Sequence, residues 1–226
     1  LCALAGCPVP ENLSDSDDTR VLREALSTSD RLVNVGHAGT AMRFLTAYLS
    51  RIIGKWVLTG SERMKQRPIR VLVEALNRLG ARIGYLENEG FPPLEIYGSR
   101  LVGGSIDIPA SVSSQYISAL LMIAPYMEKG LEIRLTGKVV SSSYIDMTLQ
   151  IMREFGAEVG REDTVIGVKP GEYRSVPYRV ESDWSAASYF YELLAIAGEG
   201  EIILTGLKEK SMQGDSRQTV VWRKLG

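Results

Sequence analysis

The tripeptide Leu-Thr-Gly occurs three times in this chain, as Leu58-Thr59-Gly60, Leu135-Thr136-Gly137 and Leu204-Thr205-Gly206. Each copy ends a strand-like run and precedes a polar loop, which leads into a helical pattern that ends at a glycine. One supersecondary unit is therefore repeated along the chain. Such units bury their apolar faces against one another, so the repeat decides the architecture before any motif is weighed.

The helix after the tripeptide has the same apolar pattern in the first two units. The apolar positions are Ile69, Val73, Leu76 and Leu79 in the first unit, and Ile145, Leu149, Met152 and Phe155 in the second. Intervals of three and four residues place each set on one helix face. We expect Pro68 in the first helical turn, where its missing N–H is tolerated, and Gly80 and Gly156 as left-handed C-terminal caps.

Strands and a second helix complete each unit, which indicates an α/β fold. The predicted strands are Lys55–Val57, Ala81–Ile83, Leu94–Ile96, Ser105–Ile108, Leu131–Arg134, Ala157–Val159, Val165–Ile166, Tyr178–Val180 and Glu201–Ile203. The second helices are predicted at Ala41–Leu49, Tyr116–Tyr126 and Ala186–Ala197. Because these helices are apolar nearly all round, we expect them to be buried.

The chain does not begin or end on a unit boundary. Residues 1–26 have the pattern of the second half of a unit, and the sequence stops at Gly226, where the other two units continue into a strand. We therefore expect an internal, truncated piece of a longer protein. The apolar fraction of 45% supports a sizeable core, and the length suits one large domain or one domain plus part of a second.

Composition argues against several classes of function. The net charge is −1, from 26 basic and 27 acidic residues, so neither a general nucleic-acid surface nor an anionic-membrane surface is indicated. Cys2 and Cys7 are too few for a disulfide framework, which favours a reducing cytoplasm. No apolar run approaches the roughly 18 residues of a membrane span. His37 is the single histidine, which argues against histidine-based metal or triad chemistry, and we expect no metal site.

Two clusters in the first unit are suited to binding an anion. Gly36–Arg43 joins a strand to a helix N-terminus, where free N–H groups and the helix dipole favour negative charge; the alternative is a tight turn with Thr40 as the cap and His37 as a polar loop residue. Arg63–Pro68 places three cations just before a helix, where they oppose the dipole. A bound carboxylate or phosphate would explain that placement, and a solvated basic loop is the alternative.

Equivalent positions of the second unit carry hydroxyl groups. Ser111–Gln115 begins a helix and suits either phosphate binding or simple N-capping. Ser141–Tyr144 follows the second Leu-Thr-Gly, and its alternative is a polar loop with Tyr144 in packing. Ser182–Ser185 is interpreted as a structural cap with Trp184 partly buried. The other four clusters lie at two equivalent points of the first two repeats. Together they predict one ligand face for a small, polar, anionic ligand.

Five motifs follow one another along the chain: Gly39-Thr40-Ala41-Met42-Arg43, Arg63-Met64-Lys65-Gln66-Arg67-Pro68-Ile69, Ser113-Ser114-Gln115, Tyr144-Ile145-Asp146 and Ser211-Met212-Gln213-Gly214-Asp215. Together they resemble the 5-enolpyruvylshikimate-3-phosphate synthase family (3-phosphoshikimate 1-carboxyvinyltransferases). The resemblance implies an α/β (α+β) fold of two domains. Each domain holds three βαβαββ units with pseudo-threefold symmetry and buried helices. Residues 1–181 would be the substrate-binding N-terminal domain, incomplete at its start, and residues 182–226 the first, truncated unit of the second domain.

The resemblance also implies an activity. These enzymes transfer the enolpyruvyl group of phosphoenolpyruvate to the 5-hydroxyl of shikimate 3-phosphate by addition and elimination, and they release phosphate without a cofactor. The step belongs to the shikimate pathway, which leads to chorismate and the aromatic amino acids. A cytoplasmic monomer is expected. Neither nucleic acid nor a membrane is implied as a partner.

Site residues follow from the resemblance, motif by motif. Shikimate 3-phosphate would be held by Ser113, Ser114, Gln115, Ser141 and Tyr144. Phosphoenolpyruvate would be held by Gly39, Arg67 and Gln115, with Thr40 and Arg43 supporting the loop. The family's general acid–base residues have no counterpart in the 226 residues, so we expect no catalytic residue within this chain.

Two positions depart from the family pattern, and two alternatives stay open. His37 stands where asparagine is common, and Ser143 stands where proline is common. The enzyme alternative is UDP-N-acetylglucosamine enolpyruvyl transferase, which uses a reactive loop cysteine that neither Cys2 nor Cys7 resembles. The other alternative is a truncated, inactive domain that only binds shikimate 3-phosphate.

Overall fold

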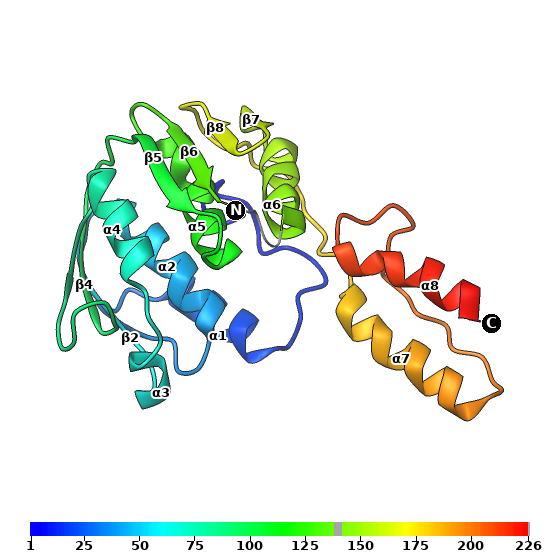
Figure 1. Cartoon of the computed structure of the whole chain (residues 1–226). Coiled ribbons are helices and arrows are strands. Elements are labelled where there is room, and N and C mark those ends of the chain that lie inside the picture. The colour runs from blue at the N-terminus through cyan, green and yellow to red at the C-terminus, as the bar shows by residue number, and fades with distance from the viewer. Residues whose placement is uncertain (138–141, 226) are drawn as a thin grey trace.

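The computed structural model describes residues 1–137 and 142–225. The first repeat forms a sheet with the strand order β1-β2-β4-β3 (Figure 1). Its strands are β1 (Leu32–Asn34), β2 (Gly54–Thr59), β3 (Arg82–Tyr85) and β4 (Leu94–Gly98). Its helices are α2 (Gly39–Arg51), α3 (Glu62–Lys65) and α4 (Arg70–Arg78). Apart from the short α3, the order is βαβαββ.

The second repeat forms a sheet with the equivalent order, β5-β6-β8-β7. Its strands are β5 (Gly104–Pro109), β6 (Leu131–Thr136), β7 (Val159–Glu162) and β8 (Val165–Val168). Its helices are α5 (Ser114–Ile123), the 3-10 turn η1 (Ala124–Tyr126) and α6 (Ser142–Glu154). In both sheets the first two strands are parallel and the other two pairings are antiparallel. The predicted repeat is therefore confirmed at the level of strand pairing for the first two units.

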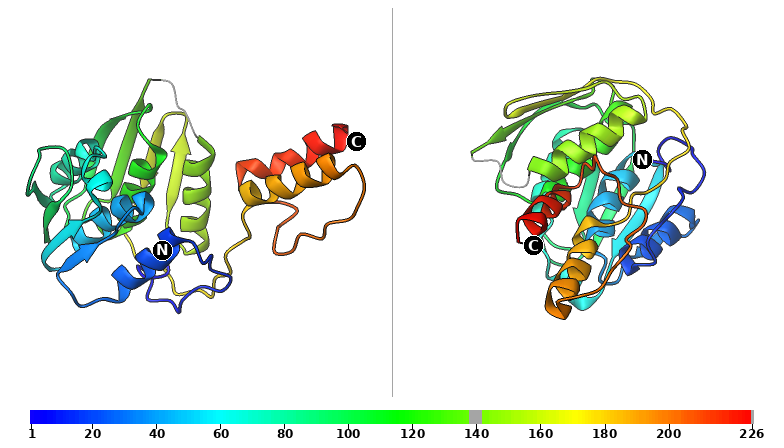
Figure 2. Two further views of the ribbon diagram at one scale, coloured as in Figure 1. Left: turned by 90° about the horizontal axis from the view of Figure 1, so that it is seen from below. Right: turned by 90° about the vertical axis from the view of Figure 1, so that its right-hand side faces the viewer.

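The crossover helices form the centre of the molecule. Each of α2 and α5 connects two parallel strands, which requires a crossover rather than a tight turn, and the two helices pack on each other. Both are buried over most of their length, as their apolar composition predicts. The two sheets lie outside these helices (Figure 2). Along β5 and β6 buried and less buried residues alternate, as expected for strands that cover a core on one face. The predicted α/β fold is correct, and so is the predicted burial of these two helices.

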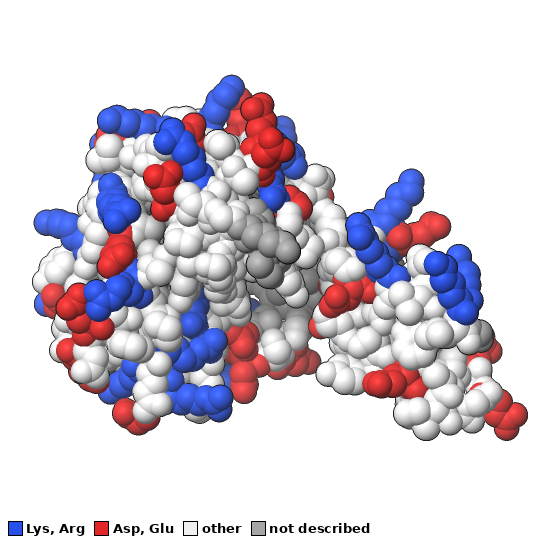
Figure 3. Space-filling view, viewed as in Figure 1, with Lys and Arg blue, Asp and Glu red and all other residues white. Residues whose placement is uncertain are grey.

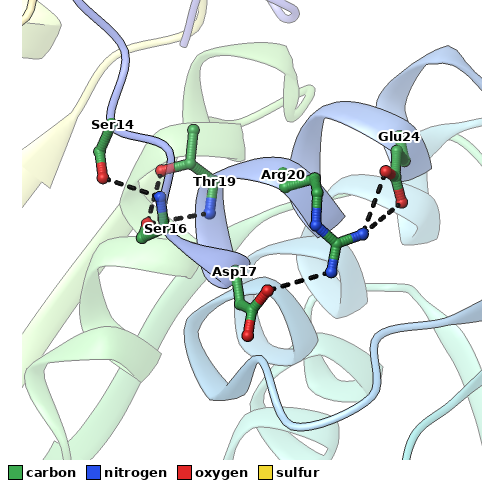
Figure 4. Close-up of polar contacts among 6 residues, drawn as sticks. All are labelled: Ser14, Ser16, Asp17, Thr19, Arg20 and Glu24. Atoms are coloured by element: carbon green, nitrogen blue, oxygen red, sulfur yellow. Dashed lines mark hydrogen bonds and ion pairs between the residues drawn. The ribbon is translucent and has the colours of Figure 1, made fainter.

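Helix α1 (Asp17–Ser27) is an exposed exception that depends on local polar contacts (Figure 4). Ser16 caps it, because its hydroxyl accepts a hydrogen bond from the Thr19 N–H at 3.4 Å. Arg20 lies between Asp17 and Glu24, at 3.1 Å from each. Such exposed pairs contribute little because water screens them, so the packing of α1 on α2 has to supply the rest of its stability.

Of the two predictions about helix ends, the one for the C-termini is correct and the one for Pro68 is wrong. Gly80 and Gly156 have φ values of 103° and 87°, as expected for residues that end helices in the left-handed region. Pro68 lies outside α4, which begins at Arg70 with Ile69 as its N-cap. The reason is α3: this short helix takes up the residues before Gln66, so the chain must turn again before α4 begins.

The third repeat differs from the prediction. Helix α7 (Trp184–Ala197) forms, followed by η2 (Gly214–Arg217) and α8 (Gln218–Leu225), but the predicted strands Tyr178–Val180 and Glu201–Ile203 do not. A single bridge joins Arg179 to Glu11. In the complete units the central strand bonds to a neighbour on each side, whereas the described residues after Leu204 form irregular segments, turns and helices but no strand. Residues 201–203 therefore have no partner strand among the described residues.

The predicted burial of the third crossover helix is also wrong. Helices α7 and α8 lie beside each other, apart from the two sheets (Figures 1 and 2), and Tyr191 stacks on Trp222 with ring centroids 6.0 Å apart. On the other faces of α7, Leu193 is 58% exposed and Ile196 is 80% exposed. Within residues 1–137 and 142–225, no helix has the length and apolar character needed to cross a membrane.

Because α5 is buried and α7 is largely exposed, the same leucine-to-alanine substitution should lower the free energy of unfolding by different amounts in the two helices. Leu120 in α5 is fully buried in the core, and Leu193 in α7 is mostly exposed. Leu120→Ala should lower the free energy of unfolding by about 2–5 kcal/mol, because it leaves a cavity. Leu193→Ala should lower it by less than about 0.5 kcal/mol. Urea unfolding followed by circular dichroism measures both, and equal costs would contradict the exposure of α7.

Candidate functional site

A buried arginine lies one turn into α2. Arg43 is 5% exposed, and its Nη1 donates a hydrogen bond to the Gly39 carbonyl oxygen at 2.9 Å. Among the described residues its charged neighbour is another arginine, Arg67, and no carboxylate balances it. A buried charge without a partner is unfavourable. Arg43 is therefore suited to an external anion.

Arg67 lies against the first residue of α2. A Cβ atom at Gly39 would overlap the Arg67 guanidinium and would lie 3.0 Å from Nη1 of Arg43, so a larger residue here would push the end of the Arg67 side chain away from the start of α2. Burial lowers the pKa of Arg43, and the charge of Arg67 lowers it further, while Tyr116 acts in the opposite direction. An anion between the two guanidinium groups would remove their repulsion.

The backbone at this point adds further donors. The N-cap of α2 is Ala38, which offers no side-chain cap, so the first N–H groups of this 13-residue helix are free for a ligand. The alternative in which Thr40 caps the helix is wrong, because Thr40 is the second residue of α2. Its hydroxyl instead accepts a hydrogen bond from Nε2 of Gln115 at 3.1 Å.

The cations of the basic loop have different surroundings. Lys65 forms ion pairs with Glu87 at 3.0 Å and Glu62 at 3.3 Å, and its hydrogen bonds with these carboxylates raise its pKa. Arg63 is exposed. The loop is anchored by Met64, whose side chain is buried with its Sδ 3.9 Å from Nη1 of Arg43. Of these cations, Arg67 is the one that the fold places against α2.

A histidine–serine contact joins the two loops of the first repeat. Nδ1 of His37 lies 2.9 Å from Oγ of Ser61, and the Ser61 N–H donates to the Gly36 carbonyl oxygen at 2.9 Å. Oγ of Ser61 also accepts a hydrogen bond from the Met64 N–H at 3.3 Å, which caps α3. One ring nitrogen of His37 is therefore occupied in loop bracing, a role that the sequence pattern did not indicate for Ser61.

The start of α5 meets the start of α2 and the basic loop. Ser113 caps α5 through a hydrogen bond from the Gln115 N–H to its Oγ at 3.3 Å, and Ser114 is the first helical residue. Gln115 reaches Thr40 as described above. The Tyr116 hydroxyl donates to the Pro68 carbonyl oxygen at 2.6 Å, a contact that no sequence motif indicates.

Helix α6 packs beside α5, on which α2 also packs. Ser141 falls outside the described residues, and Tyr144 is 54% exposed in the first turn. Ser118 of α5 and Thr148 of α6 join the two helices, with their hydroxyl oxygens 2.8 Å apart. Tyr144 lines a cavity of 610 Å³, together with residues that include Met147, Tyr178, Glu181, Met212 and Asp215.

The predicted residues thus form two neighbouring groups. Arg43 and Arg67 both lie against Gly39, and Gln115 reaches Thr40 from the start of α5, which Ser113 and Ser114 begin. Tyr144 lines the 610 Å³ cavity instead. Figure 3 shows basic side chains gathered over α3 and the start of α2. The cavity is lined by residues of α6 and by residues near the start of α7.

The fifth cluster is structural, as predicted. Asp183 caps α7 by accepting a hydrogen bond from the Ser185 N–H at 2.8 Å, and Trp184 is buried. Glu181 accepts hydrogen bonds from Nε1 of Trp184, the Lys208 N–H and the Ser211 hydroxyl, each at 2.9 Å. Burial acts to raise the pKa of Glu181, but these donors outweigh it and lower the pKa. No motif in the sequence indicates this organising carboxylate.

The isolated charge of Arg43 predicts opposite effects on stability and on anion binding. Arg43→Met removes a buried charge and keeps most of the volume, so the free energy of unfolding should stay the same or rise by up to about 2 kcal/mol. Binding of inorganic phosphate, followed by NMR titration, should weaken at least about tenfold because a charged hydrogen-bond donor is lost.

Arg78→Met is the matched control, because Arg78 is an exposed arginine in the last turn of α4. It should leave phosphate binding unchanged. A loss of more than about 2 kcal/mol in Arg43→Met would mean that the guanidinium stabilises the fold rather than a ligand site.

Comparison with known sequences assigns the chain to a family. The family model for EPSP synthase (3-phosphoshikimate 1-carboxyvinyltransferase) matches residues 11–226. A 3-phosphoshikimate 1-carboxyvinyltransferase of Bacteroides fragilis is 54% identical over 222 residues, which cover 98% of this chain and 54% of that protein. The enzyme of the same name from Salmonella dublin is 43% identical, over 100% of this chain and 60% of that protein. The chain therefore spans little more than half the length of these relatives.

Two solved structures of EPSP synthase from Acinetobacter baumannii share the fold, each with a TM-score of 0.72. One is 22% identical and covers 84% of this chain and 48% of the other. The second is 20% identical and covers 99% of this chain and 67% of the other. At these identities the structures support the architecture alone. From the family model and the sequence relatives, we conclude that this chain belongs to the EPSP synthase family.

Proposed function

We propose that this chain supplies substrate-binding residues of a 3-phosphoshikimate 1-carboxyvinyltransferase. The reaction transfers the enolpyruvyl group of phosphoenolpyruvate to the 5-hydroxyl of shikimate 3-phosphate and releases phosphate. The observation that carries the proposal is the pair of arginines at the uncapped start of α2, with Arg43 buried and no carboxylate beside it among the described residues. Such a group needs an anion, and both substrates are anions.

Phosphoenolpyruvate would bind at Gly39 and Arg67. The absence of a side chain at Gly39 lets a ligand approach the free N–H groups of α2, and Arg67 offers a planar fork that matches a carboxylate or phosphate. Arg43 would act from its buried position below Gly39: it would donate its hydrogen bond to the Gly39 carbonyl oxygen and add positive charge to the site. Placing these donors before the substrate arrives lowers the cost of bringing two like-charged substrates together.

Shikimate 3-phosphate would bind on the second repeat. Ser113 and Ser114 place hydroxyl groups at the start of α5, Ser141 would contribute from outside the described residues, and Tyr144 would lie along the ring from the adjacent cavity. Gln115 lies between the two groups, because its Nε2 already reaches Thr40 at 3.1 Å. It is therefore suited to contact both substrates.

Other parts of the assignment rest on the family relationship. We place the proton-transferring residues in segments outside this chain, and we assign residues 182–226 to the beginning of a second domain whose cleft includes the 610 Å³ cavity. The protein would act in the cytoplasm as a monomer, in the shikimate pathway that leads to chorismate and the aromatic amino acids. It would need no metal or organic cofactor.

Phosphate release and calorimetry test the proposal on the purified 226-residue chain. Shikimate 3-phosphate should bind alone, and phosphoenolpyruvate should bind more tightly in its presence. Phosphate release that requires both substrates would establish transfer by this chain, and binding without release would establish a substrate-binding module. Absence of binding of either substrate would refute the proposed site.

Loss of Arg67 should weaken phosphoenolpyruvate binding specifically. Arg67→Ala removes a charged bidentate donor, so the binding free energy should weaken by about 2–3 kcal/mol, which raises the dissociation constant roughly 30- to 150-fold. Affinity for shikimate 3-phosphate alone should change by less than about threefold, because its contacts lie on α5 and α6. Arg78→Ala is the control for the loss of one positive charge. Equal effects of the two variants would assign the loss to net charge rather than to a direct contact.

A further inference from the structure

Residues 1–7 form a closed turn whose chemistry the candidate site does not use. The Ala5 N–H donates to the Leu1 carbonyl oxygen, and the Cys7 N–H donates to the Cys2 carbonyl oxygen, each at 2.9 Å. Gly6 between them has a φ of 63°. A hydrogen bond from the sixth residue back to the first, with a left-handed glycine before it, is the Schellman ending of a helix. That motif brings the side chains of its first and sixth residues together, and here both are cysteines.

The two thiols are neighbours at the edge of the core. Both cysteines are free, half-buried and packed against the core. Burial raises the pKa of the Cys2 thiol, and the Cys7 thiol adds to this effect. The two residues are thus neighbours through the backbone bond of the turn.

We propose that Cys2 and Cys7 are a modification site that forms a reversible intramolecular disulfide. The backbone bond at 2.9 Å holds the two residues face to face, as the short Cα separation of a disulfide requires. The oxidant is a small-molecule disulfide such as oxidised glutathione. One cysteine thiolate attacks it, forms a mixed disulfide and releases one glutathione thiolate.

The second cysteine thiolate then attacks the protein sulfur of the mixed disulfide. The Cys2–Cys7 bond forms as the second glutathione thiolate leaves. In the balance, two protein thiols lose two protons and two electrons, and one oxidised glutathione becomes two thiols. A dithiol reductant reverses both steps.

The turn and the residues just after it contact the second repeat and the segment that leads from β8 to α7. The Leu4 carbonyl oxygen accepts a hydrogen bond from the Tyr126 hydroxyl at 2.5 Å, which fixes the turn on the second repeat. The Glu11 N–H donates to the Tyr178 carbonyl oxygen, and the Val180 N–H donates to the Glu11 carbonyl oxygen, each at 3.0 Å. The disulfide closes within the existing turn, so it forms without breaking these contacts.

Mass spectrometry of the intact 226-residue chain after treatment with oxidised glutathione tests the proposal. The expected product is a monomer about 2 Da lighter than the reduced chain, with no glutathione attached and no titratable thiol left. Cys2→Ser and Cys7→Ser should each stop at a single glutathione adduct. Two adducts on the unsubstituted chain, or disulfide-linked dimers as its main product, would overturn the proposal.

Two further comparisons test whether the folded turn, rather than the short distance between the cysteines in the sequence, sets the rate of disulfide formation. The disulfide should form at least about tenfold faster in the native chain than in urea, because the native turn already holds the thiols together. Gly6→Ala should slow it several-fold, because alanine strains the left-handed position although no other group lies near the added Cβ. Circular dichroism checks that this variant is folded. Equal rates in native and unfolded chains would show that the turn plays no part.

Discussion

The packing of α2 on α5 is the contact on which the rest of the structure depends. Each helix is apolar nearly all round and connects two parallel strands of its own sheet, so each can be buried only if another layer covers the side away from that sheet. The other crossover helix is that layer. Their contact joins the two repeats into one body, and it brings the start of α2 to Gln115 near the start of α5.

The position of the candidate site follows from that contact. The strand-to-helix connections of both repeats come to one region, and a helix N-terminus presents free N–H groups and positive potential there. Arg43 adds a full charge beneath the surface, and Arg67 adds another above it. A protein that places two guanidinium groups side by side without a carboxylate gives up stability at that point, and an anionic ligand restores it on binding.

Much of this arrangement could be predicted from the sequence, because it depends on local pattern. The three Leu-Thr-Gly copies and the spacing of Ile69, Val73 and Leu76 specify the repeat, and the glycines at the helix ends specify where α4 and α6 stop. Arg67 was predicted as a ligand residue, and its place against Gly39 is consistent with that prediction. These features rest on short-range rules of helices and strands.

The features that could not be predicted depend on partners far away in the chain. Glu201–Ile203 has the composition of a strand, but a strand needs a neighbour to bond with, and the described residues provide none there. Likewise, Lys65 and Arg67 look alike in sequence, and only the fold brings Glu87 to Lys65 and leaves Arg67 beside Arg43.

Gln115 shows how two repeats can act as one site. Its backbone N–H donates to the hydroxyl of Ser113, the N-cap of α5, and its side-chain amide reaches Thr40 of α2, so one residue contacts the start of both helices. The amide still has an oxygen acceptor and a second hydrogen to offer a ligand. A ligand that orders Gln115 from the α5 side therefore also fixes a donor beside Gly39, which reduces the ordering cost for a second ligand there. Cooperation between two anionic ligands can thus arise from a single hydrogen bond between repeats, despite the repulsion between their charges.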